Sequence, residues 1–270
     1  MTPTSRRRHL PMAVAMALGA LATACGGGGG DAASGVPAGG DEAATVEVVT
    51  TVGADGTAGG PAAPSTVALS VVAQATVPEV VARAAPDDAA EAVAELANPI
   101  ASGSPLVFLV EDDADPDPDW IQVLLPVEPN GTTGWLRRSD VTLTTNPYRI
   151  EIDRETFSLR VFDRDDVWIE TTIGVGTGDT PTPVGDFYLL ELLAPPDPSG
   201  PYGPYAFGLS GFSEVLDSFG SADTAVIGLH GTNDPASIGT NASYGCIRLA
   251  NDVISELAAS LPLGTPVHIT

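Results

Sequence analysis

The sequence HGTNDPASIGTNASYGCIRLANDVISEL, residues 230–257, contains the features that decide the fold of the C-terminal half. It begins at the end of an apolar run, TAVIGLH, which predicts a strand ending at His230. A loop rich in Gly, Asn and Ser follows, and it leads the chain to Cys246. The remainder places apolar residues at helical spacing, with Asn251 as a natural N-cap. We therefore expect a strand, a long loop and a helix, with the cysteine just before the helix.

The segments on either side of this stretch are typical of β-strands. YRIEID and FSLRVFD alternate apolar and polar residues, as half-buried strands do, and DVWIETTIGVG, VGDFYLLELL and the terminal TPVHIT continue the pattern. Residues 147–270 are therefore predicted to form a mainly β domain with one clear helix after the cysteine.

Residues 71–146 contain short apolar runs separated by turn signals, among them PLVFLV and WIQVLL. The ending GWLRRSDV resembles the closing strand of bacterial SH3-like modules. The resemblance implies a small SH3-like β-barrel over this range, ahead of the C-terminal domain.

The N-terminus predicts export from the cytoplasm. Three arginines at 6–8 precede an apolar run that is too short to span a bilayer, so residues 1–24 are predicted to be a signal peptide. Cys25 follows at a position that resembles a bacterial lipidation site; the alternative is cleavage at Ala-x-Ala with an incidental cysteine. Residues 25–70 are rich in Gly, Ala, Asp and Pro and predict a flexible, lipid-anchored linker. We expect a lipoprotein that is anchored to the cell membrane and faces the cell wall.

The charge of the chain excludes some partners. The formal net charge is −24, and the sequence contains no lysine. Such a chain repels nucleic acids and anionic lipid headgroups, so we expect neither as a ligand and membrane contact only through the lipid anchor. Solubility is the simpler explanation of the acidity itself.

The cysteines and histidines are too few for a metal site or a disulfide framework. The two cysteines are Cys25, at the predicted lipidation site, and Cys246, so Cys246 is expected to be a free thiol. His9 lies in the signal peptide, which leaves His230 and His268. No spacing of these residues resembles a zinc motif, and we predict neither a metal nor a cofactor.

A free thiol outside the cytoplasm is a candidate nucleophile, and it needs a base because its reference pKa is about 8.5. The loop after His230 can return Cys246 to its side, whereas His268 lies in an exposed-looking terminal strand. The amides of Gly245 and Cys246 could form an oxyanion hole, aided by the N-terminus of the following helix.

The segment from His230 to Leu257 resembles the signature of the L,D-transpeptidase family, whose catalytic domain is of the YkuD type. TPTPVGDFYL and LPLGTPVHI resemble two further segments of that domain, in the same order. The resemblance implies that Cys246 is the nucleophile and His230 the base. The further substrate-binding residues that it implies are Ser243, Tyr244, Gly245, Arg248, Gly231 and Thr232. Tyr244 stands where the family has a histidine, so the activity could be altered.

The resemblance implies a substrate as well. Cys246 would take an acyl group from the third, diamino-acid residue of one peptidoglycan stem peptide, form a thioester, and pass the group to the side-chain amine of a second stem. Carbapenem inhibition is then expected. The alternatives are hydrolysis of the thioester by water, which makes an L,D-carboxypeptidase, and a weak or inactive wall-binding lipoprotein. Arg248 would contact a substrate carboxylate or form a structural ion pair.

The segment 195–214, PPDPSGPYGPYAFGLSGFSE, is long and rich in Gly, Pro and aromatic residues. It looks like the substrate-covering lid of the family, with Tyr202, Tyr205 and Phe207 lining the cleft. The alternative is a surface loop with a few packed rings.

Overall fold

The computed structural model describes residues 69–111, 119–219 and 224–270. All of these belong to one compact unit. The predicted signal peptide, Cys25 and most of the predicted linker lie outside the described residues. In the described part of the chain, no helix is long and apolar enough to cross a membrane.

The first part of the described chain forms an antiparallel sheet of seven strands in the order β3-β2-β6-β5-β4-β1-β7. The strands are β1 (Ser70–Ala75), β2 (Glu79–Arg83), β3 (Ala92–Ala97), β4 (Val107–Val110), β5 (Trp120–Leu124), β6 (Thr133–Arg137) and β7 (Val141–Asn146), with a 3₁₀ turn, η1 (Arg138–Asp140), before the last. Its core consists of side chains such as Leu106, Phe108 and Leu136, which are fully buried. The resemblance of this region to an SH3-like module stays a prediction.

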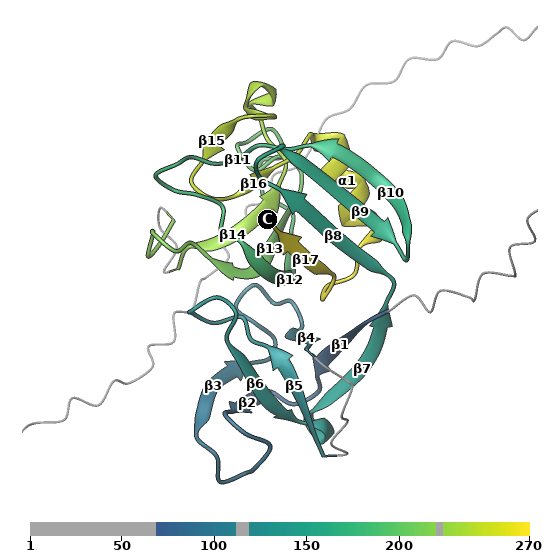
Figure 1. Ribbon diagram of the computed structural model, residues 1–270, viewed down its shortest axis with the longest axis vertical. Helices are drawn as coiled ribbons and strands as arrows, with labels where there is room; N and C mark the ends of the chain where they lie inside the picture. The colour runs from purple at the N-terminus through teal and green to yellow at the C-terminus, as the bar shows by residue number, and fades with distance from the viewer. Residues whose placement is uncertain (1–68, 112–118, 220–223) are drawn as a thin grey trace, which may run out of the picture. The chain divides into compact units, whose positions relative to one another are not determined.

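The second part contains an eight-stranded mixed sheet in the order β10-β9-β8-β17-β12-β13-β14-β16 (Figure 1). Its strands are β8 (Tyr148–Asp153), β9 (Ser158–Asp163), β10 (Asp166–Thr172), β12 (Gly185–Leu193), β13 (Ala206–Phe212), β14 (Val226–His230), β16 (Ile247–Arg248) and β17 (Pro266–Ile269). Two short strands, β11 (Val175–Gly176) and β15 (Asn241–Ser243), form a separate parallel sheet. A 3₁₀ turn, η2 (Pro235–Ser237), lies between β14 and β15 in the sequence.

The helix α1 (Asn251–Ser260) is the only α-helix of the described chain, and it contacts β13 and β14. Ile254 and Leu257 are fully buried and join the core formed by the larger sheet. The mainly β fold with one helix behind the cysteine is therefore confirmed.

The start of the helix differs from the expectation. Ala250 occupies the N-cap position, and Asn251 is the first helical residue. The Asn251 side chain instead accepts a hydrogen bond from the Thr232 amide at 2.8 Å. Strand β16 also lies between Cys246 and the helix, and the field of a helix terminus falls off within its first turn. The helix dipole is therefore not adjacent to the thiol.

Candidate active site

Cys246 lies in the turn between β15 and β16 and is partly buried. Strand β16 pairs in parallel with β14, with Leu229 opposite Ile247 and His230 opposite Arg248. This pairing brings the cysteine against β14, where its Sγ accepts a hydrogen bond from the Gly228 amide at 3.4 Å. The topology of the sheet therefore unites the thiol with the end of β14.

Ser243 fixes the turn that carries the thiol. Its hydroxyl accepts the Gly245 N–H at 3.1 Å and donates to the Cys246 carbonyl at 2.5 Å. Gly245 has φ of +118°, and a Cβ at this position would lie 3.0 Å from Ile227 Cδ1, so a side chain is disfavoured on both counts. Because Ser243 engages the Gly245 amide, that N–H is committed to the turn in this structure.

Thr182 holds the same turn from the opposite side. Its buried hydroxyl donates to the Gly245 carbonyl at 2.8 Å and accepts the Gly176 N–H at 2.9 Å. The N–H and C=O of one peptide unit point in opposite directions. Fixing the Gly245 carbonyl therefore also fixes the direction of the Cys246 N–H.

His230 is the last residue of β14, and only 4% of its surface is exposed. Its Nδ1 lies 2.5 Å from the Gly231 carbonyl oxygen. A carbonyl can only accept, so this contact assigns the proton to Nδ1 and leaves Nε2 with a lone pair. Tyr202 packs edge-on against the imidazole, with ring centroids 4.9 Å apart. These two contacts hold the ring in one orientation, in which Nε2 can accept a proton.

Burial keeps both reactive groups neutral at rest. It lowers the pKa of His230, an effect that the Gly231 carbonyl opposes and that the nearby Arg248 cation adds to. It raises the pKa of the Cys246 thiol, which the Gly228 amide and Arg248 lower in part. The arrangement therefore favours a thiol beside a neutral imidazole over a preformed thiolate–imidazolium pair.

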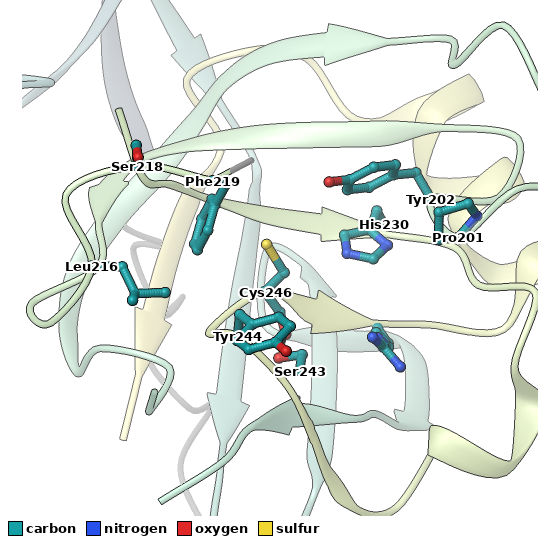
Figure 2. A pocket seen from close by; sticks show the side chains of 10 residues that line it. Pro201, Tyr202, Leu216, Ser218, Phe219, His230, Ser243, Tyr244 and Cys246 are labelled. Atoms are coloured by element: carbon teal, nitrogen blue, oxygen red, sulfur yellow. Dashed lines mark hydrogen bonds between the residues drawn. The ribbon is translucent and has the colours of Figure 1, made fainter. Parts of the chain in front are cut away.

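Both groups line a cleft of about 630 Å³. Figure 2 shows the Cys246 sulfur and the His230 ring pointing into it, with Tyr202 above the imidazole. Tyr244 stands at the rim with 73% of its surface exposed. Arg248 also lines the cleft, and its buried Nε has no hydrogen-bond partner among the described residues. The remaining lining residues are Pro201, Leu216, Ser218, Phe219 and Ser243.

Several residues of the predicted site lie elsewhere. Phe207 is fully buried in β13 within the core, so the expectation that it lines the cleft is wrong. Tyr205 packs against the same core, and its carbonyl accepts the Gly231 N–H at 3.3 Å. The segment 195–214 is therefore part loop and part strand, and of its three predicted aromatic residues Tyr202 reaches the cleft.

Gly231 and Thr232 serve the packing behind His230. A Cβ at Gly231 would lie 2.3 Å from the Asn251 Oδ1, so the close approach of the helix requires a glycine there. The Thr232 amide donates to that same oxygen. These two residues position the end of β14 against the helix and do not line the cleft.

The second histidine is remote from the thiol. His268 lies exposed on β17, and its Nδ1 pairs with Asp186 Oδ1 at 2.6 Å. It lines a different, smaller pocket. Within the part of the chain that the structure describes, no group of three or more His, Cys, Asp or Glu side chains could hold a metal ion.

Two kinds of site residue were not predicted from the sequence. Gly228 acts through one hydrogen bond and Thr182 through two, and the local sequence singles out neither residue. Leu216 and Phe219 come from the segment SEVLDSFG, residues 213–220, where they and Val215 are apolar side chains among polar residues. Large apolar residues in a polar loop are a signal that could have pointed to a binding surface.

Comparison with known proteins identifies the C-terminal region. Residues 147–269 match the family model of the L,D-transpeptidase catalytic domain. A putative L,D-transpeptidase YkuD of Bacillus licheniformis is 39% identical over 126 residues, which cover 47% of this chain and 67% of that protein. The putative L,D-transpeptidase YqjB of Bacillus subtilis is 32% identical over 138 residues, covering 47% of this chain and 73% of that protein.

A solved structure matches a similar share of the chain. The catalytic domain of an Enterococcus faecium L,D-transpeptidase has 25% sequence identity and a TM-score of 0.33, covering 46% of this chain and 96% of that one.

Proposed function

The chain belongs to the L,D-transpeptidase family, and from this premise we propose that its C-terminal domain transfers acyl groups between peptidoglycan stem peptides through Cys246. The observation that carries the proposal is the cleft itself. It holds a partly buried thiol and a neutral imidazole whose Nε2 is free to take a proton.

The first half-reaction forms the thioester. His230 Nε2 takes the Cys246 proton, and the sulfur attacks the carbonyl carbon of the third, diamino-acid residue of the donor stem. When the resulting tetrahedral intermediate collapses, the C–N bond to the terminal D-alanine breaks. His230 returns its proton to the leaving amine, which leaves a thioester on Cys246 and a neutral imidazole.

The second half-reaction releases the product. The side-chain amine of a third-position residue on a neighbouring stem attacks the thioester carbonyl, and His230 takes a proton from that amine. The C–S bond then breaks, the sulfur recovers the proton, and a 3–3 cross-link results. Water in place of the amine gives the carboxypeptidase outcome.

In both steps negative charge develops on the sulfur and on the substrate carbonyl oxygen, and backbone N–H groups held in place by the fold stabilise it. The Gly228 amide already donates to Sγ and stabilises negative charge on the sulfur. Since Ser243 engages the Gly245 amide, we assign the oxyanion to the Cys246 N–H, whose direction Thr182 fixes. Arg248 lines the cleft, and its cationic side chain there supports a contact with a substrate carboxylate.

The same proposal includes the place of the protein in the cell. A lipid on Cys25 and a flexible linker would hold the domain outside the membrane, within reach of the cell wall. Fatty-acid labelling in cells tests this part: label should appear on the wild type and disappear in Cys25→Ala. Equal label on both proteins contradicts the anchor.

The chemistry is tested by intact mass spectrometry after incubation with the carbapenem imipenem. We expect a covalent adduct on the wild type and none on Cys246→Ala. A wild-type protein that stays unmodified, or an adduct that persists in Cys246→Ala, contradicts the proposal. A tetrapeptide stem with an amine acceptor then separates cross-linking from hydrolysis by the masses of the products.

A further inference from the structure

One wall of the active-site cleft is formed by residues 213–219, a segment that begins where β13 ends. Leu216, Ser218 and Phe219 from this segment line the cleft that contains Cys246. Leu216 also lines a second cavity of about 510 Å³, which lies between residues 128–130 and residues 212–217. The wall therefore has open space on both of its sides, and its position depends on how its root is held.

The root of the wall is Phe212, whose backbone is directed away from β14. The Ser213 N–H donates to the Ala225 carbonyl at 2.8 Å, next to the Phe212–Val226 pair. In an antiparallel ladder this makes Phe212 and Val226 a non-hydrogen-bonded pair. The N–H and C=O of Phe212 consequently point to the opposite edge of β13. The paired register of β12 with β13 runs only from Leu193–Ala206 to Leu189–Leu209, so it stops short of Phe212.

A side chain from the N-terminal sheet takes the place of the missing strand. Asn130, in the turn between β5 and β6, donates from Nδ2 to the Phe212 carbonyl at 2.9 Å. Its Oδ1 accepts the Phe212 N–H, also at 2.9 Å. The primary amide satisfies both backbone groups at once, as a paired strand residue would.

The turn that carries Asn130 is itself fixed to the eight-stranded sheet that contains β12 and β14, which we call the catalytic sheet. Tyr188 of β12 is fully buried, packs with Val72, Val107 and Leu124, and donates its hydroxyl to the Leu124 carbonyl at 3.4 Å. Leu124 is the last residue of β5, just before the turn. The amide of Asn130 is thus presented from a packed base and not from a free loop.

Downstream of the Asn130–Phe212 clamp, the wall is supported by bonds to its own root and, at its far end, by Phe219, which packs against the core of the eight-stranded sheet. The Ser213 hydroxyl accepts the N–H groups of Val215 and Leu216 at 3.4 and 3.2 Å. These bonds shape the first turn of the wall, but they join it to its own root. Motion at Phe212 would therefore move Leu216, which faces the cleft.

We propose that Asn130 is a positioning residue of the active site, through which the N-terminal sheet sets the wall 213–219 against the substrate cleft. It touches no reacting atom. Its effect is on substrate binding, because the wall supplies lining side chains and not the nucleophile or base. The inference rests on the proposed acyl-transfer function for its catalytic consequence, but its structural part stands independently.

The test compares Asn130→Ala, which removes both bonds, with Asn130→Asp, which is isosteric and loses only the donor. Gln122→Ala is the matched control, since Gln122 is an amide residue of the same hairpin that bonds Thr133 at 3.2 Å, away from the wall. Amide hydrogen exchange is followed for residues 213–219 and for the turn 243–246. The rate and concentration dependence of Cys246 acylation by imipenem and by a tetrapeptide stem are measured on the same proteins.

We expect Asn130→Ala to speed exchange in 213–219 by about tenfold or more, with little change in 243–246. The half-saturating concentration of the stem should rise several-fold while the maximal acylation rate changes less than about twofold. Asn130→Asp should approach Asn130→Ala, because its carboxylate faces the Phe212 carbonyl oxygen. Gln122→Ala should match the wild type in both measurements.

Unchanged exchange in 213–219 overturns the clamp. Faster exchange with unchanged acylation constants overturns its role in the site. A decrease in the maximal acylation rate of Asn130→Ala indicates general destabilisation and also overturns the proposal. So does an equal change of exchange and acylation in Gln122→Ala. If the wild type itself is not acylated, the proposed function fails, and the exchange measurement still decides whether Asn130 holds the wall.

Discussion

The two sides of the cleft are held in very different ways. The turn that carries Cys246 is fixed by the buried side chains of Ser243 and Thr182 and by the Gly228 amide of β14. The opposite wall, residues 213–219, is held at its root by Asn130 and the Ser213–Ala225 backbone bond, and at its far end by the packing of Phe219. Reacting atoms must be held to a fraction of an ångström, whereas a binding wall has to admit and release polymer strands. The difference predicts that changes near the turn reduce the rate of chemistry and changes near the wall alter binding.

The largest effect is expected at the base. His230→Ala removes the proton acceptor beside the thiol and should slow acylation of Cys246 by about a hundredfold or more. The decay of unmodified protein in imipenem, followed by intact mass, gives the rate. His268→Ala is the control, because that histidine is exposed and paired with Asp186. An equal loss in both variants would mean that the base is assigned wrongly.

A smaller effect is expected from releasing the turn. Thr182→Val keeps the shape of the side chain but leaves the buried Gly245 carbonyl and Gly176 N–H without their partner. We expect a loss of about 1–3 kcal/mol in the free energy of unfolding and an acylation rate lower by about tenfold. Urea unfolding and intact mass measure the two.

Thr156→Val removes an exposed hydroxyl that bonds Ser158 at 3.0 Å, and it should be neutral in both measurements. If Thr182→Val also leaves the acylation rate unchanged, the turn does not depend on this hydroxyl, and the contrast between the two sides of the cleft is lost.

The burial of His230 should appear in the pH dependence of stability. Its pKa is lowered in the folded protein, so the unfolded chain binds more protons as the pH falls below about 6.5, the ordinary value for histidine. Stability should therefore decrease on acidification below that pH, by at most about 1.4 kcal/mol per pH unit from this residue. In His230→Gln the corresponding part of the slope should vanish. Parallel curves for the two proteins would show that the imidazole is not held neutral by burial.

The smallest effect is expected at the rim. Tyr244 is 73% exposed, and the resemblance to the family places a histidine at this position of the sequence. Tyr244→His should fold normally and change the acylation rate only a few-fold, because the contacts that fix the turn do not involve this side chain. A shift of a full unit or more in the pH midpoint of acylation would show instead that a second imidazole controls the thiol.

The elements that could be predicted from the sequence are those with local signals. The strand ending at His230, the loop to Cys246 and a helix after the cysteine were predicted because their periodicity and glycines are local signals, although the N-cap was misplaced by one residue. Strand β3 was missed, since half of its residues are alanine and none is fully buried at this edge of the sheet. Phe207 was placed in the cleft because β13 is buried along most of its length and rich in glycine, so it lacks the alternation of a half-buried strand.

The remaining features depend on contacts between distant segments. The Asn130–Phe212 pair joins residues 82 positions apart, and Thr182 reaches Gly245 over 63 positions. A single asparagine in a turn has many local uses, and nothing in its neighbours marks a distant partner. Such residues are identified only when the fold brings the segments together.

The central claim is that Cys246 rests as a neutral thiol, which His230 deprotonates when substrate arrives. Thiolate absorbance near 240 nm, measured against pH for the wild type with Cys246→Ser as the blank, tests it directly. Burial raises the pKa of this thiol, so we predict no thiolate signal at neutral pH and a titration above the ordinary thiol value of about 8.5. A full thiolate signal at pH 6–7 that disappears in His230→Ala would contradict the claim and show a preformed ion pair.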